Sequence, residues 1–117
     1  MMGMNSIFVD IIIFGQTLER AFKILDDLLI NEYIIQDDIK RIIKSKNIYK
    51  IELKNNRRYI AIKATQGCRG YRCHRAIVDW KVDNEIIDCI IKPIATLKDE
   101  LGNDAKIEIS VYSKFIK

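Results

Sequence analysis

The sequence predicts an α/β fold, a layered sandwich whose central mixed, mainly parallel sheet has about five strands, including a β-hairpin, and is flanked by helices. Three observations predict it. Short β-branched runs alternate with segments of helical apolar spacing; the pair Asn55-Asn56 separates two strand-like runs; and five glycines, one proline and 31% charged residues are typical of an ordered globular chain. With 117 residues, 49% of them hydrophobic, the chain predicts a single domain over residues 1–117.

The opening residues predict a strand, a tight turn and a helix. Residues 7–14 read I-F-V-D-I-I-I-F, a run that is too short for a typical helix and rich in β-branched side chains, as buried strands are. Gly15 ends this run, and Thr17 is a suitable helix cap. Apolar residues then recur at helical spacing as far as Ile30, so the chain opens as a layered α/β unit.

The segment from about Gln36 to Lys44 is predicted to be a second helix. It carries acids in its first turn and bases toward its end, the arrangement that the helix dipole favours. Residues 48–53 then alternate between apolar and charged or polar side chains, and a second strand-like run covers residues 59–62. Because asparagine tolerates positive φ, Asn55-Asn56 between the two runs predicts a β-hairpin.

The second half of the chain predicts a central strand and one more helix. Gly67 and Gly70 interrupt the pattern before residues 76–78, a short apolar run that suits a central strand. Asp79 would lie at the carboxyl end of that strand. The elements predicted after it are a helix over residues 84–91 that ends near Pro93, and a last strand over residues 107–112.

Basic residues are concentrated in one acid-free segment, residues 53–78, although the net charge of the chain is only +4. Arginine forks match phosphate oxygens and an aromatic ring stacks on a base, so this segment predicts contact with nucleic acid. The alternative is a solvated loop whose arginines pair with the acids of residues 83–88. The predicted nucleic-acid-binding residues are Lys54, Arg57, Arg58, Arg69, Tyr71, Arg72 and Arg75.

Two other places suggest a metal. Asp79 follows a strand, where α/β sites are built, and is a candidate Mg²⁺ ligand; the alternative is that it caps the turn into the next helix. Cys68, Cys73, His74 and Cys89 have the ligand count of a zinc site but lack C-x₂-C spacing, and adjacent Cys73 and His74 would project in different directions. The same difference in direction is an objection to a Cys–His nucleophilic pair. Reduced thiols are the alternative, because three cysteines form no even disulfide framework.

The order of these elements resembles the ATPase domain of phage terminase large subunits. The resemblance is carried by the first strand with Gly15-Gln16, by K-I-E-L-K-N-N-R-R-Y-I-A-I-K-A, by Arg69-Gly70, by A-I-V-D with an acidic helix after it, and by the final strand I-E-I-S-V-Y-S. In that family an N-rich hairpin precedes an R-G loop, and the next strand ends in the Walker B acidic pair. The resemblance spans nearly the whole chain and implies an incomplete P-loop NTPase core of bacteriophage or prophage origin that serves DNA packaging.

The sequence departs from that family at the residues that hydrolyse ATP. It contains no G-x-x-x-x-G-K-[ST] loop to supply backbone N–H groups and a lysine to the phosphates. Asp79 matches the first acid of the Walker B pair, but Trp80 stands where the family has its catalytic glutamate. Because the sequence runs only to Lys117, we also expect the family's nuclease domain to be missing. The resemblance therefore implies a pseudo-ATPase with no catalytic residues.

Several functions are compatible with these observations. The leading hypothesis is binding of nucleic acid or a packaging component through the basic residues; the alternative is a protein-interaction module that docks on a motor ATPase or a host factor, with Trp80 as the contact. An ATPase completed in trans, a metal-dependent hydrolase and a fragment of a split gene stay open. Residues 1–14 have no basic n-region and are too short to span a bilayer, so we expect a cytoplasmic protein, in the host if viral, without membrane contact.

Overall fold

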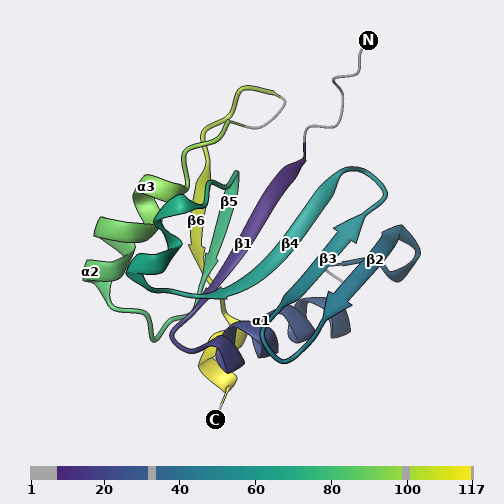
Figure 1. Cartoon of the computed structure of the whole chain (residues 1–117), viewed down its shortest axis with the longest axis horizontal. Helices are drawn as coiled ribbons and strands as arrows, with labels where there is room; N and C mark the ends of the chain where they lie inside the picture. Colours follow the sequence, from purple (N-terminus) through teal and green to yellow (C-terminus); the bar gives the residue numbers. More distant parts are fainter. Residues whose placement is uncertain (1–7, 32–33, 99–100, 117) are drawn as a thin grey trace.

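The computed structural model describes residues 8–31, 34–98 and 101–116. They form a six-stranded mixed sheet in the order β2-β3-β4-β1-β5-β6 (Figure 1). β1, β4, β5 and β6 are mutually parallel, whereas β2 and β3 are antiparallel to their neighbours, so the predicted layered, mainly parallel α/β fold is confirmed. The strands are β1 (Val9–Gly15), β2 (Ile39–Lys44), β3 (Tyr49–Leu53), β4 (Arg57–Lys63), β5 (Arg75–Val78) and β6 (Lys106–Ile109).

A tight turn joins β1 to helix α1 (Leu18–Ile30), as predicted. A Cβ on Gly15 would lie 2.4 Å from the Thr17 carbonyl oxygen and 2.5 Å from the Ala21 nitrogen, so only glycine lets this turn close. The Thr17 hydroxyl oxygen caps the helix by accepting a 3.1 Å hydrogen bond from the Arg20 N–H. The helix therefore folds back onto the strand that precedes it.

The predicted helix over residues 36–44 is wrong. Gln36–Asp38 forms a 3₁₀ turn, η1, and Ile39–Lys44 is the strand β2, antiparallel to β3. This strand is rich in β-branched isoleucine, and Ile42 lies opposite Ile51 of β3. An isolated helix of this length is marginal in water, whereas the edge of β3 offers a ladder of backbone hydrogen bonds. The sheet therefore has six strands, where the sequence predicted about five.

β3 and β4 form the predicted hairpin. Asn56 adopts a φ of 64°, the left-handed region that asparagine tolerates. The side-chain oxygen of Asn55 accepts a 3.2 Å hydrogen bond from the Arg57 N–H, which closes the turn locally. This turn fixes where β4 begins and hence where its first side chains project.

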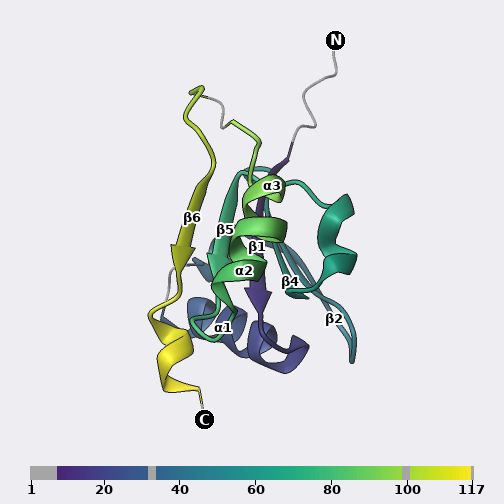
Figure 2. The same ribbon diagram turned by 90° about the vertical axis from the view of Figure 1, so that its left-hand side faces the viewer.

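The two faces of the sheet bury separate cores. On one face α1 packs Ile24, Leu25 and Leu28 against the odd-numbered residues of β1, such as Ile11, and against Tyr59 of β4. The opposite face is covered by the helix over residues 84–94 and by the 3₁₀ helix η2 (Gln66–Gly70), as Figures 1 and 2 show. The second core contains Ile12, Phe14, Cys68, Cys73, Ala76, Val78, Val82, Ile90, Ile91 and Ile94.

The helix predicted over residues 84–91 is confirmed and continues past Pro93. Its three parts are α2 (Asn84–Ile86), the π-helical turn η3 (Ile87–Ile91) and α3 (Lys92–Ile94). The Lys92 N–H bonds to the Ile87 carbonyl, five residues back. A proline inside an α-helix clashes with the carbonyl four residues earlier, and the wider π turn before Pro93 relieves that crowding.

The last strand ends earlier than predicted. β6 covers Lys106–Ile109, and Tyr112–Phe115 forms a 3₁₀ turn, η4. The Ser113 hydroxyl donates a 2.6 Å hydrogen bond to the Ser110 carbonyl and so bends the chain away from the sheet. Among the described helices, none combines the length and the apolar content that crossing a bilayer requires.

Candidate nucleic-acid interface

Four parallel strands begin at the same end of the sheet, the margin formed by their first residues. Because β1, β4, β5 and β6 are parallel, their first residues are neighbours: Val9 lies opposite Arg57, and Arg75 lies opposite both Ile11 and Lys106. We call this margin the amino edge. Two predicted binding residues, Arg57 and Arg75, are therefore brought together although they are distant in sequence, and Lys106 joins them.

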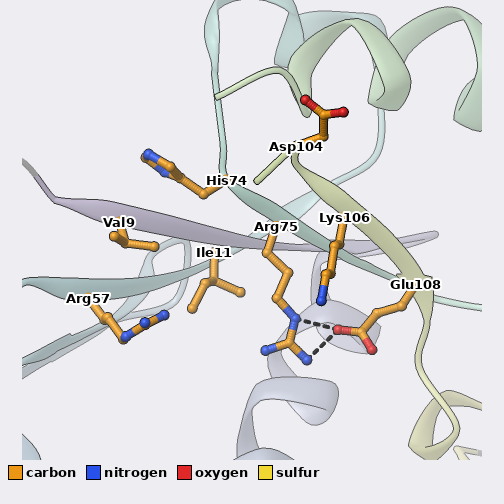
Figure 3. Close-up of a pocket in the computed structure, with 8 residues that line it drawn as sticks. All are labelled: Val9, Ile11, Arg57, His74, Arg75, Asp104, Lys106 and Glu108. Carbon is orange, nitrogen blue, oxygen red and sulfur yellow. Dashed lines mark hydrogen bonds and ion pairs between the residues drawn. The ribbon is translucent and has the colours of Figure 1, made fainter. Parts of the chain in front are cut away.

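A hollow of about 300 Å³ opens at the amino edge. Figure 3 shows Arg75 and Lys106 projecting side by side from neighbouring strands, with Arg57 on the other side of Ile11. Three cationic side chains and two carboxylates line this hollow, which leaves a positive balance. The lining residues are Val9, Ile11, Arg57, His74, Arg75, Asp104, Lys106 and Glu108.

The cations of the hollow differ in their present partners. Arg75 contacts the Glu108 carboxylate through both Nε and Nη2. Asp104 lies 3.6 Å from the ammonium group of Lys98, which is a loose pair on the surface. Within the described ranges Lys106 has no ion-pair partner. An incoming anion would therefore meet one free ammonium group and one arginine held only by a half-exposed carboxylate.

Arg58 lies on the opposite face of the sheet. Successive side chains of a strand project to opposite faces, so Arg57 and Arg58 cannot share one surface. Arg58 donates hydrogen bonds of 2.7 and 3.1 Å to the two carboxylate oxygens of Asp10, and its guanidinium lies 4.1 Å from the ring centre of Phe8. The guanidinium of Arg58 is therefore already paired within its own chain.

The remaining predicted residues are exposed but dispersed. Lys54 lies in the β3–β4 turn, next to the amino edge. Arg69 belongs to η2, and Tyr71 and Arg72 lie in the segment that leads from η2 to β5, on the side of the sheet that α3 covers. Arg72 donates to the carbonyls of Arg69 at 3.0 Å and Tyr71 at 2.6 Å, so its partners are in its own loop and not in the acidic helix. The structure thus divides the predicted basic set over two faces.

Asp79 lies where the sequence places it, at the carboxyl end of β5, but it is completely buried and paired. Arg20 of α1 donates to both of its oxygens, from Nε at 2.6 Å and from Nη2 at 2.9 Å. The backbone N–H groups of Gln16 and Lys81 add hydrogen bonds of 3.0 and 3.1 Å. The same arginine donates to the Ser113 carbonyl at 2.8 Å and so ties η4 to the sheet.

The electrostatics of this pair are those of a structural salt bridge. Burial alone would raise the pKa of Asp79, but the hydrogen bonds from Arg20, Gln16 and Lys81 outweigh it, and the net pKa lies below its ordinary value. The hydrogen bond to Asp79 raises the pKa of Arg20 in turn. A cation bound at this carboxylate would have to displace a buried arginine.

Trp80 lies directly after Asp79 and is 48% exposed. Its backbone N–H donates a 3.0 Å hydrogen bond to the Ser113 hydroxyl, so the main chain is fixed while the indole faces solvent. Trp80 is therefore placed at the opposite, carboxyl edge of the sheet from the basic hollow.

The cysteines and His74 do not converge. Cys68 and Cys73 are buried, whereas Cys89 is exposed on η3. Burial raises the pKa of Cys73 to about 11, so its thiol stays protonated at neutral pH. His74 Nδ1 accepts a 3.0 Å hydrogen bond from the Asp10 N–H. In the described ranges no three histidine, cysteine or acidic side chains cluster closely enough to hold a metal ion.

Two residues of these candidate sites were not predicted from the sequence. Lys106 lies outside the basic segment, and only the parallel pairing of β5 with β6 brings it beside Arg75. Arg20 had a visible signal, because positions 20, 24 and 28 form one stripe at helical spacing and the other two are apolar. A charged residue on a buried stripe predicts a buried partner.

No protein-family model, curated protein or solved structure is significantly similar to this chain. The class of protein that the structure defines is a mainly parallel α/β domain with a basic amino edge and a buried Arg–Asp pair. The terminase resemblance rests on the sequence motifs alone.

Proposed function

We propose that this chain is a catalytically silent, terminase-ATPase-like module of phage or prophage origin that binds the phosphate backbone of nucleic acid through its amino edge. The observation that carries the proposal is the meeting of Arg57, Arg75 and Lys106 around one hollow. These residues come from three separate strands, so their proximity is a product of the fold. Lys54 extends the same margin.

Phosphate chemistry suits this arrangement. The planar guanidinium groups of Arg57 and Arg75 present paired donors to phosphate oxygens, and Lys106 adds a point charge. Arg75 is available because its pair with Glu108 is about half exposed, and such surface pairs contribute roughly 0–1 kcal/mol. A phosphate that replaces this carboxylate would regain the lost interaction.

Catalytic silence is supported by what surrounds Asp79. In the family that the sequence resembles, the corresponding acid helps to hold Mg²⁺, whereas here both oxygens accept hydrogen bonds from Arg20. Trp80 replaces the neighbouring glutamate, and the phosphate loop has no counterpart in the sequence. A bound nucleotide would have neither a cradle nor a general base.

The direct test is the affinity of the purified chain for labelled duplex DNA, measured by fluorescence anisotropy as salt is raised. Three phosphate contacts predict a slope of log K against log salt near −2.7, or a loss of about 40-fold between roughly 50 and 200 mM salt. Absence of binding at the lowest salt would remove the proposal.

A second candidate is the protein-interaction module, favoured by the exposed indole of Trp80 on a fixed main chain. Large exposed aromatics are typical anchors of protein interfaces. Such a module would dock on a motor ATPase or a host factor. Capture of a full-length motor subunit that requires Trp80 and is indifferent to Arg69 and Arg72 would favour it over nucleic-acid binding.

A further inference from the structure

The six-stranded sheet ends in two edge strands, β2 and β6. The outer backbone groups of β6 pair with no strand in the described part of the chain, and Figure 2 shows β6 at the margin of the ribbon. An unpaired edge offers a row of N–H and C=O groups to another strand. The two edges differ in how they are protected.

β2 carries like charges that oppose pairing with itself. Its sequence is I-K-R-I-I-K, with Lys40, Arg41 and Lys44 all exposed. Lysine-rich edges are a common device against edge-to-edge association. β6 instead reads K-I-E-I, with one charge of each sign alternating with isoleucine. Only β6 is compatible with a second copy of itself.

We propose that two copies of this chain pair antiparallel through β6, about a two-fold axis that passes between the two copies of Ile107, so that these lie opposite each other. An axis perpendicular to the sheet keeps the same face of both copies on the same side. Residues directly opposite each other then project to the same face, so their two residue numbers add to an even sum. With Ile107 on the axis, Lys106 lies opposite Glu108 of the second copy, and Glu108 lies opposite its Lys106. Cross-strand pairs of opposite charge stabilise a sheet.

The neighbouring registers are disfavoured by the same rule. An axis through Glu108 would place two glutamates face to face, and an axis through Lys106 would place two lysines face to face. Like charges directly opposite each other are destabilising. The charge pattern of four residues therefore selects one register.

Apolar side chains beside β6 add to this surface. Ile109 is 46% exposed on the face that carries α2 and α3, and Val111 just beyond it is 62% exposed. In the proposed register Ile109 lies opposite Ala105 of the second copy, and the two copies of Ile107 meet on the axis. The result would be one continuous sheet of twice the width.

This pairing does not require nucleic-acid binding, although it uses Lys106, which the proposed function assigns to phosphate. Glu108 would accept both Arg75 of its own chain and Lys106 of the second copy, which a carboxylate with two oxygens can do. Because the β6 strands are antiparallel, the two amino edges would lie toward opposite ends of the joined sheet.

Sedimentation velocity over a range of protein concentrations tests the proposal, using Lys106→Glu and Glu108→Lys. Each variant alone creates two like-charge contacts in a symmetric dimer and should raise its dissociation constant about tenfold or more. An equimolar mixture of the two variants should dimerise like wild type, because both cross-strand pairs are then Glu–Lys.

Thermal unfolding of each variant alone controls for folding, since Glu108→Lys also removes the Arg75 partner, whereas Lys106→Glu leaves that pair intact. A wild-type chain that stays monomeric at the highest concentration reached would overturn the proposal. So would variants that dimerise as well as wild type, or a mixture of the two that fails to restore dimerisation.

Discussion

Arg20 donates to both carboxylate oxygens of Asp79, at 2.6 and 2.9 Å, in the interior of the protein. The pair joins α1 to the carboxyl end of β5, and Gln16 links the same carboxylate to the end of β1. It thus occupies the position at which α/β proteins commonly build a ligand site. Here the position serves stability.

Asp79→Ala should destabilise the protein by about 3–5 kcal/mol, because it leaves the Arg20 charge buried without its partner. Denaturant unfolding followed by circular dichroism measures this. The control is Asp88→Ala, which removes the exposed pair with Lys92 and should cost about 1 kcal/mol or less. Equal losses in the two variants would contradict a structural role for Asp79.

The contribution of Asp79 should depend on pH in the acid range. Its folded pKa lies below the ordinary value of 3.8, so its stabilisation is complete above that value and is lost as the pH falls through the folded pKa. The difference in unfolding free energy between wild type and Asp79→Asn should therefore shrink below about pH 4. Unfolding curves of both proteins from neutral to acid pH test this; a difference that grows toward acid would contradict it.

Gly15→Ala should destabilise the β1–α1 turn by about 1–3 kcal/mol or more. The added methyl would lie 2.4 Å from a backbone oxygen and 2.5 Å from a backbone nitrogen, neither of which can rotate away. Gly70→Ala is the matched control, since nothing lies within 4 Å of a Cβ there. Thermal melts of the two variants should differ clearly, and equal melting temperatures would refute the proposed close packing at Gly15.

Cys89 should be the only one of the three cysteines that alkylates quickly in the native protein. It is exposed, whereas Cys73 is buried with a pKa raised to about 11 and Cys68 is buried with its thiol donating to the Lys63 carbonyl at 2.9 Å. Peptide mass spectrometry after a brief treatment with iodoacetamide locates the label. Rapid modification of Cys73 would contradict its burial.

The sequence was informative wherever local patterns and tertiary packing agree. β1, Gly15 and the Thr17 cap follow from β-branched composition, a sharp break and a capping residue within a few positions of one another. The hairpin at Asn56 follows from a residue type that tolerates positive φ. Each of these features is decided by neighbours in the chain.

Prediction failed where contacts between residues far apart in the sequence determine the secondary structure or the partner of a side chain. The segment Gln36–Lys44 has the charge distribution of a helix, but pairing with β3 makes its Ile39–Lys44 part a strand. The partnership of Arg20 with Asp79 spans 59 positions, and the meeting of Arg75 with Lys106 depends on strand order.

The predicted basic face was divided for a local reason, since adjacent residues such as Arg57 and Arg58 must project to opposite sides of a strand. Alternation within β4 could have shown that in advance.

The most direct measurement of the central claim compares duplex-DNA affinity for Arg75→Gln and Arg41→Gln across a salt series. Both substitutions remove an arginine from a surface pair with glutamate, Arg75 with Glu108 at the amino edge and Arg41 with Glu52 on β2. We predict that Arg75→Gln weakens binding and reduces the salt slope by about 1, while Arg41→Gln leaves both unchanged. Equal effects of the two substitutions, or no effect of Arg75→Gln, would contradict binding at the amino edge.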